Sequence, residues 1–459
     1  MNNYSYNRRV SRERRDNSFY LRHFCRLFIG ALFIFSAYVK GVDPFGFALK
    51  IEEYLMSFGM DFLTPLSMFA ACTMLIVEFL IGVSMLCNIQ IRFFSWVLLL
   101  FMCFFLLLTF YLAYAPSIAQ AFSRLTGSSH EVFVPGDCGC FGDFIKLTNA
   151  QTFWKNVIFM VPTLVVFLQR KRFRTQDFRY VTEWGPLLLA FCFMVFMEVH
   201  CLRHEPWHDF RPWKKGHFIA AETYSEAPQI DFVFQYRNNA DGSMREITMD
   251  ELTAVSEDST ANADFENNYS YVGRKEKVIK PGVDARLTDF TLLDVETKED
   301  VKWHVMEAEG YHFLMIFRDV NRTKITKLEK LSRFAEQCRQ NGIPFMAVTA
   351  SLPSDVEKLD SRSRWHYGLN VTYPLFYSDA TPLKTALRNN LGLILMKDGY
   401  VLDKWAFRDV PTFERFMAGQ PEYERKLERY RKAEPPVLPN GDTLQLKPYF
   451  PLPIKTVRF

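Results

Sequence analysis

Five apolar runs of roughly membrane-spanning length constrain the fold of this chain more than any other feature. A transmembrane helix needs about 20 predominantly apolar residues. Because a bilayer offers no water to unpaired backbone groups, such runs cross it as helices. The first part of the 459-residue chain therefore predicts a multi-span α-helical membrane bundle of four helices plus one, with runs at 24–39, 65–87, 93–115, 152–168 and 184–201.

The first run is short and resembles the apolar core of a secretory signal peptide. Arg22, Arg26 and Lys40 flank it, and their side chains can reach the interface from inside the membrane. The following stretch 39–44 offers no small-x-small cleavage site. We therefore expect a retained span rather than a cleaved leader.

Positive charge near the span ends predicts the orientation, since Lys and Arg favour the cytoplasmic side. With five spans, the three basic segments before the first run, between the second and third runs, and between the fourth and fifth runs all fall on one side of the membrane. The N-terminus is then cytoplasmic, and the loop 116–151 and the chain after about 202 are expected in the periplasm of a cell with an inner membrane. The basic residues that set this orientation are Arg8, Arg9, Arg12, Arg14, Arg15, Arg22, Arg92, Arg170, Lys171, Arg172, Arg174 and Arg179.

A thiol pair in that outer loop, Cys138-Gly139-Cys140, is the main candidate for chemistry. Glycine lets the backbone bend so that both sulfurs face one point. Four roles stay open: a redox-active pair, a structural disulfide within the pair or with Cys201, a metal site that two thiolates leave short of ligands, and inert thiols. We favour exchange chemistry, because a Cys-x-Cys disulfide closes a small strained ring that is easily reduced.

Polar residues inside the apolar runs form a second set of candidates. Glu78 lies in the middle of a run, where an ionisable group is costly and faces the bundle interior. It serves either as a proton relay or as a protonated carboxyl bonded to a neighbouring helix, and Asn156 poses the same alternative. Lys155 is expected to extend outward, and Lys40 and Asp43, at the outer end of the first run, are candidates for shaping a vestibule near the thiol pair.

Other Cys and His residues have simpler interpretations. His200 and His204 have the i, i+4 spacing of many metal pairs, but an interfacial polar collar is the favoured reading. Among the cysteines of the apolar runs and the later chain, inert packing is expected for Cys25, Cys72, Cys87, Cys103, Cys192 and Cys338.

Several motifs of the apolar half resemble the DoxX-like superfamily of membrane proteins, and within it the MauE-type methylamine-utilisation branch. They are Ser36-Ala37-Tyr38-Val39-Lys40, Glu78-Phe79 followed by Gly82, the stretch 137–143, and Lys155-Asn156. The resemblance covers about 20–170 and implies a redox-linked role. MauE-type proteins are associated with disulfide handling during maturation of a periplasmic dehydrogenase, and DoxX-type proteins with quinone-linked thiosulfate oxidation.

The resemblance makes Cys138 and Cys140 the expected catalytic residues, with a periplasmic protein thiol or a quinone as partner. No cofactor is evident, and neither a metal site nor a nucleic-acid stripe is expected, since the net charge is only +4. A non-enzymatic assembly or scaffold factor with a structural loop disulfide is the alternative. A small-solute transporter is a weaker third possibility.

The soluble half alternates strands and helices from about residue 280, which predicts a three-layer α/β domain. Expected strands lie at 312–317, 343–350 and 373–379, with two more around the 397–399 turn. The order resembles the thioredoxin-like fold of the peroxiredoxin and TlpA-like branch. The family's Cys-x-x-Cys is missing, since 318–324 contains no cysteine. We therefore expect a docking module or a cap without thiol chemistry of its own.

Around these domains the chain is expected to divide into further segments. A polar, loop-like stretch is expected at 254–267, Trp213 is expected at the membrane interface, and the proline-rich end is expected to be extended and partly mobile. The predicted divisions are a basic tail at 1–22, a four-helix membrane domain at 23–170, a fifth span at 171–203, a connector with a small β element at 204–279, a thioredoxin-like domain at 280–420 and a final helix with tail at 421–459.

Overall fold

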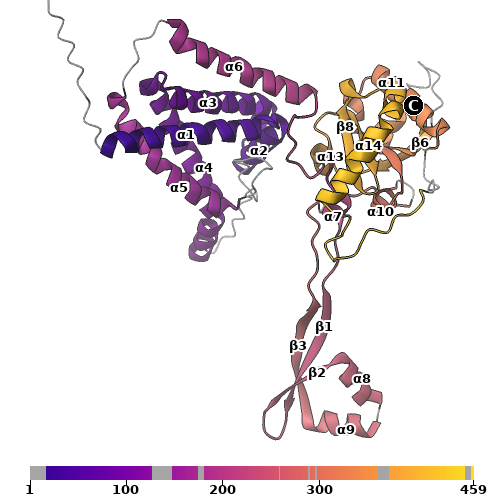
Figure 1. Ribbon diagram of the computed structural model, residues 1–459. Helices are drawn as coiled ribbons and strands as arrows, with labels where there is room; N and C mark the ends of the chain where they lie inside the picture. Colours follow the sequence, from indigo (N-terminus) through magenta and orange to yellow (C-terminus); the bar gives the residue numbers. More distant parts are fainter. Residues whose placement is uncertain are drawn as a thin grey trace, which may run out of the picture. The chain divides into compact units, whose positions relative to one another are not determined.

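The chain divides into two compact units, Met1–Arg211 and Pro212–Phe459. We call them the helical unit and the α/β unit. Figure 1 shows helices alone in the first, and helices with two β-sheets in the second. The computed structural model describes residues 17–126, 147–173, 180–257, 259–287, 290–294, 297–359, 372–449 and 456–458.

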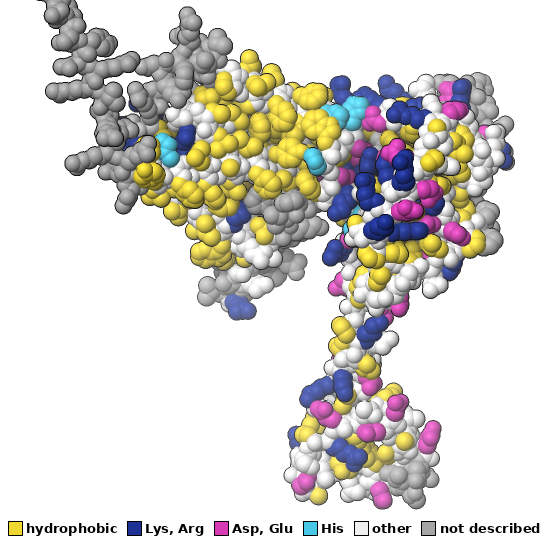
Figure 2. Space-filling model, viewed as in Figure 1, with side chains coloured by type: hydrophobic (Ala, Val, Ile, Leu, Met, Phe, Trp, Pro, Cys, Tyr) yellow, Lys and Arg dark blue, Asp and Glu magenta, His cyan; other side chains and the backbone are white. Residues whose placement is uncertain are grey.

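The described helices of the helical unit match the apolar runs and add one more. They are α1 (Asn17–Gly41), α2 (Pro44–Ser57), α3 (Ser67–Cys87), α4 (Ile91–Thr126), α5 (Asn149–Leu168) and α6 (Tyr180–Arg203). All but α2 are long and apolar enough to cross a membrane. Hydrophobic side chains cover much of the visible face of this unit (Figure 2). The prediction of a multi-pass membrane protein is confirmed.

Close packing of α1 against α3 depends on two glycines. A Cβ atom on Gly82 would lie 2.9 Å from the carbonyl oxygen of Gly30 and 2.8 Å from the backbone nitrogen of Ile34. A Cβ atom on Gly30 would lie 3.0 Å from the carbonyl oxygen of Gly82. Small residues let membrane helices approach to backbone contact, so this pair sets how closely α1 and α3 pack.

Helix α2 was not predicted, although its start carries a recognisable signal. Asp43 caps the helix by accepting a hydrogen bond from the backbone N–H of Gly46 at 3.0 Å, and Pro44 occupies the first helical position. An Asx cap followed by proline is typical of a helix start. The helix is short for a span, so a search for long apolar runs passes over it.

A six-stranded sheet forms the centre of the α/β unit, in the order β8-β7-β4-β5-β6-β9. Strands β4, β5 and β6 are parallel, whereas β7 and β8 continue the sheet antiparallel from β4. The bounds are β4 (Tyr311–Phe317), β5 (Phe345–Thr349), β6 (Thr372–Tyr377), β7 (Leu391–Lys397), β8 (Tyr400–Ala406) and β9 (Thr456–Arg458). The predicted core strands are confirmed within a few residues.

Helices connect and cover these strands. The chain passes from β4 through α11 to β5, and from β6 through α13 to β7. Phe313 of β4 is fully buried and packs edge-on against Phe334 of α11 and Phe416 of α14. The remaining bounds are α7 (Ile219–Thr223), α10 (Lys302–Met306), α11 (Ile325–Gln340), α13 (Ala380–Ala386) and α14 (Phe413–Ala433).

A second sheet has the order β2-β1-β3 and carries two short helices. Its elements are β1 (Gln229–Asn238), β2 (Met244–Thr248), α8 (Met249–Glu257), α9 (Ser259–Asn268) and β3 (Tyr269–Lys280). A small β element was expected within 204–279, and β1 and β2 form an antiparallel hairpin there. The loop expected at 254–267 is largely helical. Phe265 of α9 packs on Tyr236 of β1 with ring centroids 4.8 Å apart, so one aromatic anchor holds a polar segment that pattern alone leaves as loop.

The segments before and after the α/β core also pack into it. Trp213 is fully buried against Phe290, so its expected place at the membrane interface was wrong. In the proline-rich end, Leu444 belongs to the core cluster and the backbone N–H of Lys447 donates to the carbonyl of Glu307 at 2.8 Å. Residues 435–449 are therefore held against the unit rather than extended from it.

Candidate functional site

The predicted redox pair, Cys138 and Cys140, lies outside the described residues. The structure describes the chain again from residue 147, where Thr148 and Gln151 form a reciprocal capping box that starts α5. Lys155 and Asn156 follow within the first turns of that helix. Both residues line the polar cavity described next.

A cavity of about 50 Å³ lies among α1, α3, α4 and α5, which is room for a few water molecules. Most of its wall is apolar and aromatic, including Phe33, Phe101 and Phe105. Its polar lining consists of Ser36, Lys40, Glu78, Lys155 and Asn156. A polar pocket inside membrane helices is costly to build and is usually functional.

A buried ion pair forms one wall of this cavity. The Nζ atom of Lys40 donates to Oε2 of Glu78 at 2.5 Å, and the two side chains are 4% and 6% exposed. The ammonium also lies 5.1 Å from the ring centroid of Phe47 on α2, a favourable cation–π distance. Either charge alone would be expensive among apolar helices, so each requires the other.

This pair joins two residues that the sequence left apart. Glu78 was expected in the bundle interior, either as a proton relay or as a protonated carboxyl bonded to a neighbouring helix, and the structure places it in the interior, paired with a cation. Its partner is Lys40 of α1, which had been assigned to an outer vestibule. Sequence spacing cannot show the contact, because the two residues belong to different helices and meet only when Gly30 and Gly82 bring α1 against α3.

A second polar contact crosses the bundle beside the first. The side-chain amide of Asn156 on α5 donates to the hydroxyl of Thr109 on α4 at 3.2 Å. Thr109 in turn donates to the carbonyl of Phe105 at 2.7 Å. The chain Asn156–Thr109–Phe105 fixes the amide at the cavity wall. The neighbouring Lys155, expected to extend outward, also lines the cavity.

The candidates near the end of α6 form a polar and aromatic collar. The rings of His200 and His204 stack with centroids 4.9 Å apart, and His200 also contacts Trp207. His208 bonds through Nδ1 to the hydroxyl of Tyr38 at 2.7 Å. Among the residues that the structure describes, no group of three metal-ligating side chains is placed to hold an ion.

Two further polar clusters bring together side chains whose contacts were not predicted from the sequence. On α6, the carboxyl of the buried Glu198 lies beside the thiol of Cys72 on α3. Cys201, the expected outer partner of the thiol pair, is buried on α6 with 3% of its surface exposed. A carboxyl near the end of a predicted span was visible in the sequence, but the identity of its partner was not.

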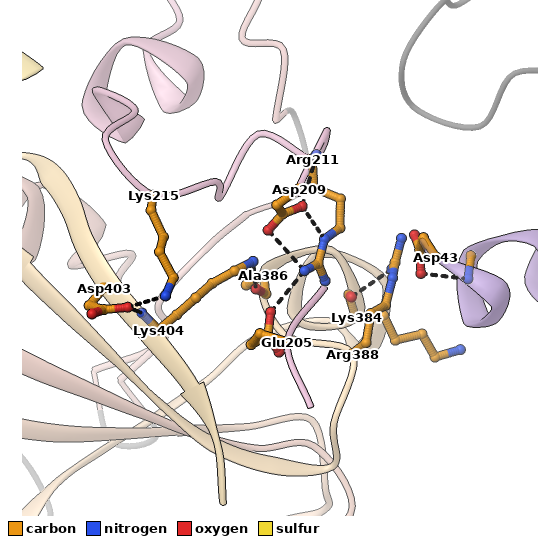
Figure 3. Close-up of polar contacts among 11 residues, drawn as sticks. Asp43, Glu205, Asp209, Arg211, Lys215, Lys384, Ala386, Arg388, Asp403 and Lys404 are labelled. Atoms are coloured by element: carbon orange, nitrogen blue, oxygen red, sulfur yellow. Dashed lines mark hydrogen bonds and ion pairs between the residues drawn. The ribbon is translucent and has the colours of Figure 1, made fainter. Parts of the chain in front are cut away.

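Arg211 forms the second cluster at the end of the helical unit. It is 2% exposed; its Nε atom bonds Asp209 at 2.6 Å and its Nη2 atom bonds Glu205 at 2.9 Å. Both carboxylates point toward the guanidinium in Figure 3. Burial acts to lower the pKa of Arg211, but the charges of Asp209, Glu205 and Asp43 outweigh it and raise the pKa. This network fastens the chain just beyond the last span.

The comparison with protein families places a known model over this bundle. Residues 18–169 match the family model described as methylamine utilisation protein MauE. The match runs from α1 to the end of α5, so it includes every helix that lines the cavity as well as the segment of Cys138 and Cys140. A search of curated proteins found no match. About a third of this multi-pass membrane protein, the part with the cavity, is thus similar to MauE.

Proposed function

We propose that this chain is a membrane accessory protein in which Cys138 and Cys140 cycle between dithiol and disulfide. The observation that carries the proposal is that one family-matched segment, 18–169, contains both the thiol pair and every residue of the polar cavity. The similarity to MauE supports a membrane-associated accessory role. The redox step is our inference from the chemistry of a Cys-Gly-Cys loop.

The proposed exchange conserves atoms and electrons. A partner dithiol attacks the Cys138–Cys140 disulfide through a mixed disulfide, and leaves as a disulfide while both cysteines become thiols. Two electrons and two protons have then entered this chain. A lipid-soluble quinone of the bilayer then accepts the two electrons and two protons and becomes the quinol, while the Cys138–Cys140 disulfide re-forms.

The cavity supplies the kind of groups that such an acceptor requires. Lys40 and Asn156 bring hydrogen-bond donors to its wall, and Glu78 brings an acceptor. A carbonyl oxygen that reached this cavity would find donors in a site largely lined with aromatic rings. These residues would bind and orient the acceptor, and the sulfur pair would react.

We further propose that the α/β unit has a thioredoxin-like fold and binds a partner without reacting. The strand order β8-β7-β4-β5 with antiparallel β7 and β8 supports that fold. In thiol-reactive members the cysteines follow the first core strand, which corresponds here to the position after β4. Residues 318–324 contain no cysteine, and Cys338 of α11 is fully buried. The pattern of basic residues supports a periplasmic α/β unit and a cytoplasmic N-terminus in a cell inner membrane.

Thiol trapping on the full chain in lipid nanodiscs tests the redox proposal. Samples are treated with reductant or oxidant, alkylated with a mass tag and compared with the Cys138→Ser and Cys140→Ser variants. We expect two tags at these positions after reduction and none after oxidation. Cys192→Ser, which removes an exposed thiol of α6, is the matched control and should cycle normally.

Equal labelling of Cys138 and Cys140 under both conditions would contradict the redox role. A protein that assembles its partner normally with both cysteines replaced by serine would instead support the scaffold alternative. Capture of a mixed disulfide by the Cys140→Ser variant would identify the thiol partner.

A further inference from the structure

Basic side chains gather at one edge of the α/β unit, where β4 ends. The parallel strands β4, β5 and β6 extend to one side of this point, and the antiparallel β7 lies on the other. Ligands of open α/β sheets bind outside the carboxyl ends of the strands, where the strand order reverses. Arg318 directly follows β4, so it stands at the position in this sheet that is best suited to binding.

Three arginines come together at this edge from two separate loops. The Nη2 atom of Arg318 donates to the backbone carbonyl of Arg388 at 3.0 Å, which joins the end of β4 to the loop before β7. Arg388 is itself anchored, since its Nη1 atom donates to the carbonyl of Lys384 at 2.6 Å (Figure 3). Arg322 lies in the turn before α11, with an 84% exposed side chain beside Asp319 at 3.2 Å.

The loops that hold the arginines are fixed by a side-chain bridge. The amide of Asn390 donates to the carbonyl of Asp319 at 2.8 Å and to the hydroxyl of Thr323 at 3.0 Å, and its oxygen accepts from the backbone N–H of Asp319 at 2.8 Å. Asn390 therefore ties the turn after β4 to the loop before β7. The arginines consequently stand on a preformed scaffold, which reduces the entropy cost of binding.

The groups at this edge are mainly donors. Among the described residues, the buried Nδ2 atom of Asn389, next to Arg388, has no hydrogen-bond partner. The local field is positive: burial together with the charges of Arg388 and Arg322 lowers the pKa of Arg318 to about 10, while Asp319 acts in the opposite direction. Clustered guanidinium groups and an unused amide donor are complementary to carboxylates, which accept several hydrogen bonds at once.

We propose that this edge, formed by Arg318, Arg322, Arg388 and Asn389, binds the carboxylates of an acidic extended segment of a partner protein. The inference rests on the docking role in the proposed function and names the chemistry of the docked partner. A peptide fits better than a single small anion, because the arginines arise from two loops and present more than one binding point. Arginine forks pair with carboxylates in bidentate geometry.

Peptide binding to the full chain in nanodiscs of neutral lipid tests this inference. The probe is a fluorescent hexaglutamate peptide followed by anisotropy, with hexaglutamine as its uncharged counterpart. We expect saturable binding of hexaglutamate alone, weakening several-fold between 50 and 300 mM salt, that is between Debye lengths of about 14 and 6 Å. Arg322→Ala should weaken binding about 3-fold to 10-fold, and adding Arg388→Gln should weaken it further.

Arg339→Ala is the matched control, since this exposed arginine lies in the last turn of α11 and pairs with Glu336. Its peptide affinity should stay within about twofold of wild type, with unfolding midpoints reported for every variant. The proposal would be overturned if Arg339→Ala lost as much peptide affinity as Arg322→Ala, or if free succinate bound as tightly as the peptide. It would also be overturned if anionic-lipid nanodiscs competed with the peptide for the wild-type chain but not for Arg322→Ala. Cycling of Cys138 and Cys140 with a small dithiol should be unchanged in Arg322→Ala, so failure of the dock is distinguishable from failure of the redox role.

Discussion

The helical unit and the α/β unit bury charge for different purposes. In the helical unit, Lys40 and Glu78 pair deep among apolar helices and face a cavity. In the α/β unit, ion pairs such as Glu434 with His217 and Asp398 with Arg431 instead join separate chain segments. A charged pair that lines a cavity can be reached by a ligand, whereas an ion pair whose two members serve only each other across two segments is not available in the same way. The difference therefore separates a candidate site from structural fastening.

The largest expected effect tests the packing that creates the cavity. Gly82→Ile should prevent the helical unit from folding, because even a Cβ atom there would meet the backbone of α1. Loss of a monodisperse peak in detergent size-exclusion chromatography would show it. Gly185→Ile is the control, since a Cβ atom on this α6 glycine has open space around it. Similar behaviour of both variants would mean that the α1–α3 contact does not set the fold.

A somewhat smaller effect tests whether the buried pair serves stability or function. Glu78→Leu should destabilise the helical unit by about 3–5 kcal/mol, because it leaves the ammonium of Lys40 buried without its partner. Adding Lys40→Met should recover most of that loss, measured by thermal unfolding in detergent. We expect the double variant to fold yet lose quinone-dependent reoxidation of the thiol pair. Full activity of the double variant would make the pair structural, like those of the α/β unit.

His217 contacts two carboxylates, Glu222 at 3.0 Å and Glu434 at 2.7 Å, and we call these contacts the His217 clasp. The clasp predicts that the stability of the α/β unit depends on pH. Burial acts to lower the pKa of His217, but hydrogen bonds and charges from Glu222 and Glu434 outweigh it and raise the pKa above its ordinary value of 6.5. The raised pKa means that the clasp contributes fully below about pH 6.5, and that its contribution is lost as pH rises through the folded-state pKa. Hydrogen bonds to a charged partner contribute about 1.5–3 kcal/mol.

A pH series of unfolding experiments on the α/β transition of the full chain measures this contribution. His217→Gln should be less stable than wild type at pH 6, and the gap should narrow as pH rises. Tyr449→Phe, which removes a hydroxyl elsewhere in the same unit, should follow the wild-type pH dependence. A gap that stays constant with pH would show that His217 acts by packing alone.

The smallest expected effect concerns exposed ion pairs. Arg339 bonds Glu336 on the surface of α11, with the arginine side chain 65% exposed. Arg339→Ala should change the stability of the α/β unit by no more than about 0.5 kcal/mol, because solvent screens the pair. If the free energy of unfolding measured by chemical denaturation fell by more than about 1 kcal/mol, exposed ion pairs would stabilise this unit more than solvent screening permits.

Periodicity and length predicted the elements whose pattern is strong. The five spans are long apolar runs, and strands such as β4 and β7 are continuous buried runs, so both kinds of element were identified. The strand bounds agree within a few residues, but α4 continues to Thr126, well beyond the predicted end of its apolar run at 115. Helices α2, α8 and α9 were missed because they are short, and α8 and α9 are also polar. Their stability comes from contacts such as Phe265 on Tyr236, which no local pattern records.

The site could be predicted only in part. Glu78 could be recognised as a candidate because an ionisable side chain inside a span is costly in lipid. Asn156 could be recognised because it is a polar side chain in a span. The pairing of Glu78 with Lys40 depends on how α1 packs on α3, and the arginine edge depends on a loop before β7 meeting the end of β4. Both are tertiary contacts between distant segments. Cys138 and Cys140 stay a prediction, because they lie outside the described residues.

The entry of the chain into the α/β unit has a mechanical consequence. Gly216 donates to the carbonyl of Val401 at 2.7 Å, and Val401 donates back to His217 at 3.1 Å, so the first residues of the unit are hydrogen-bonded to β8. Tension arriving from the bilayer anchor would load these bonds and the buried indole of Trp213 before it reached the central strands. We therefore expect these contacts to resist a force applied through the connecting segment before the central strands separate.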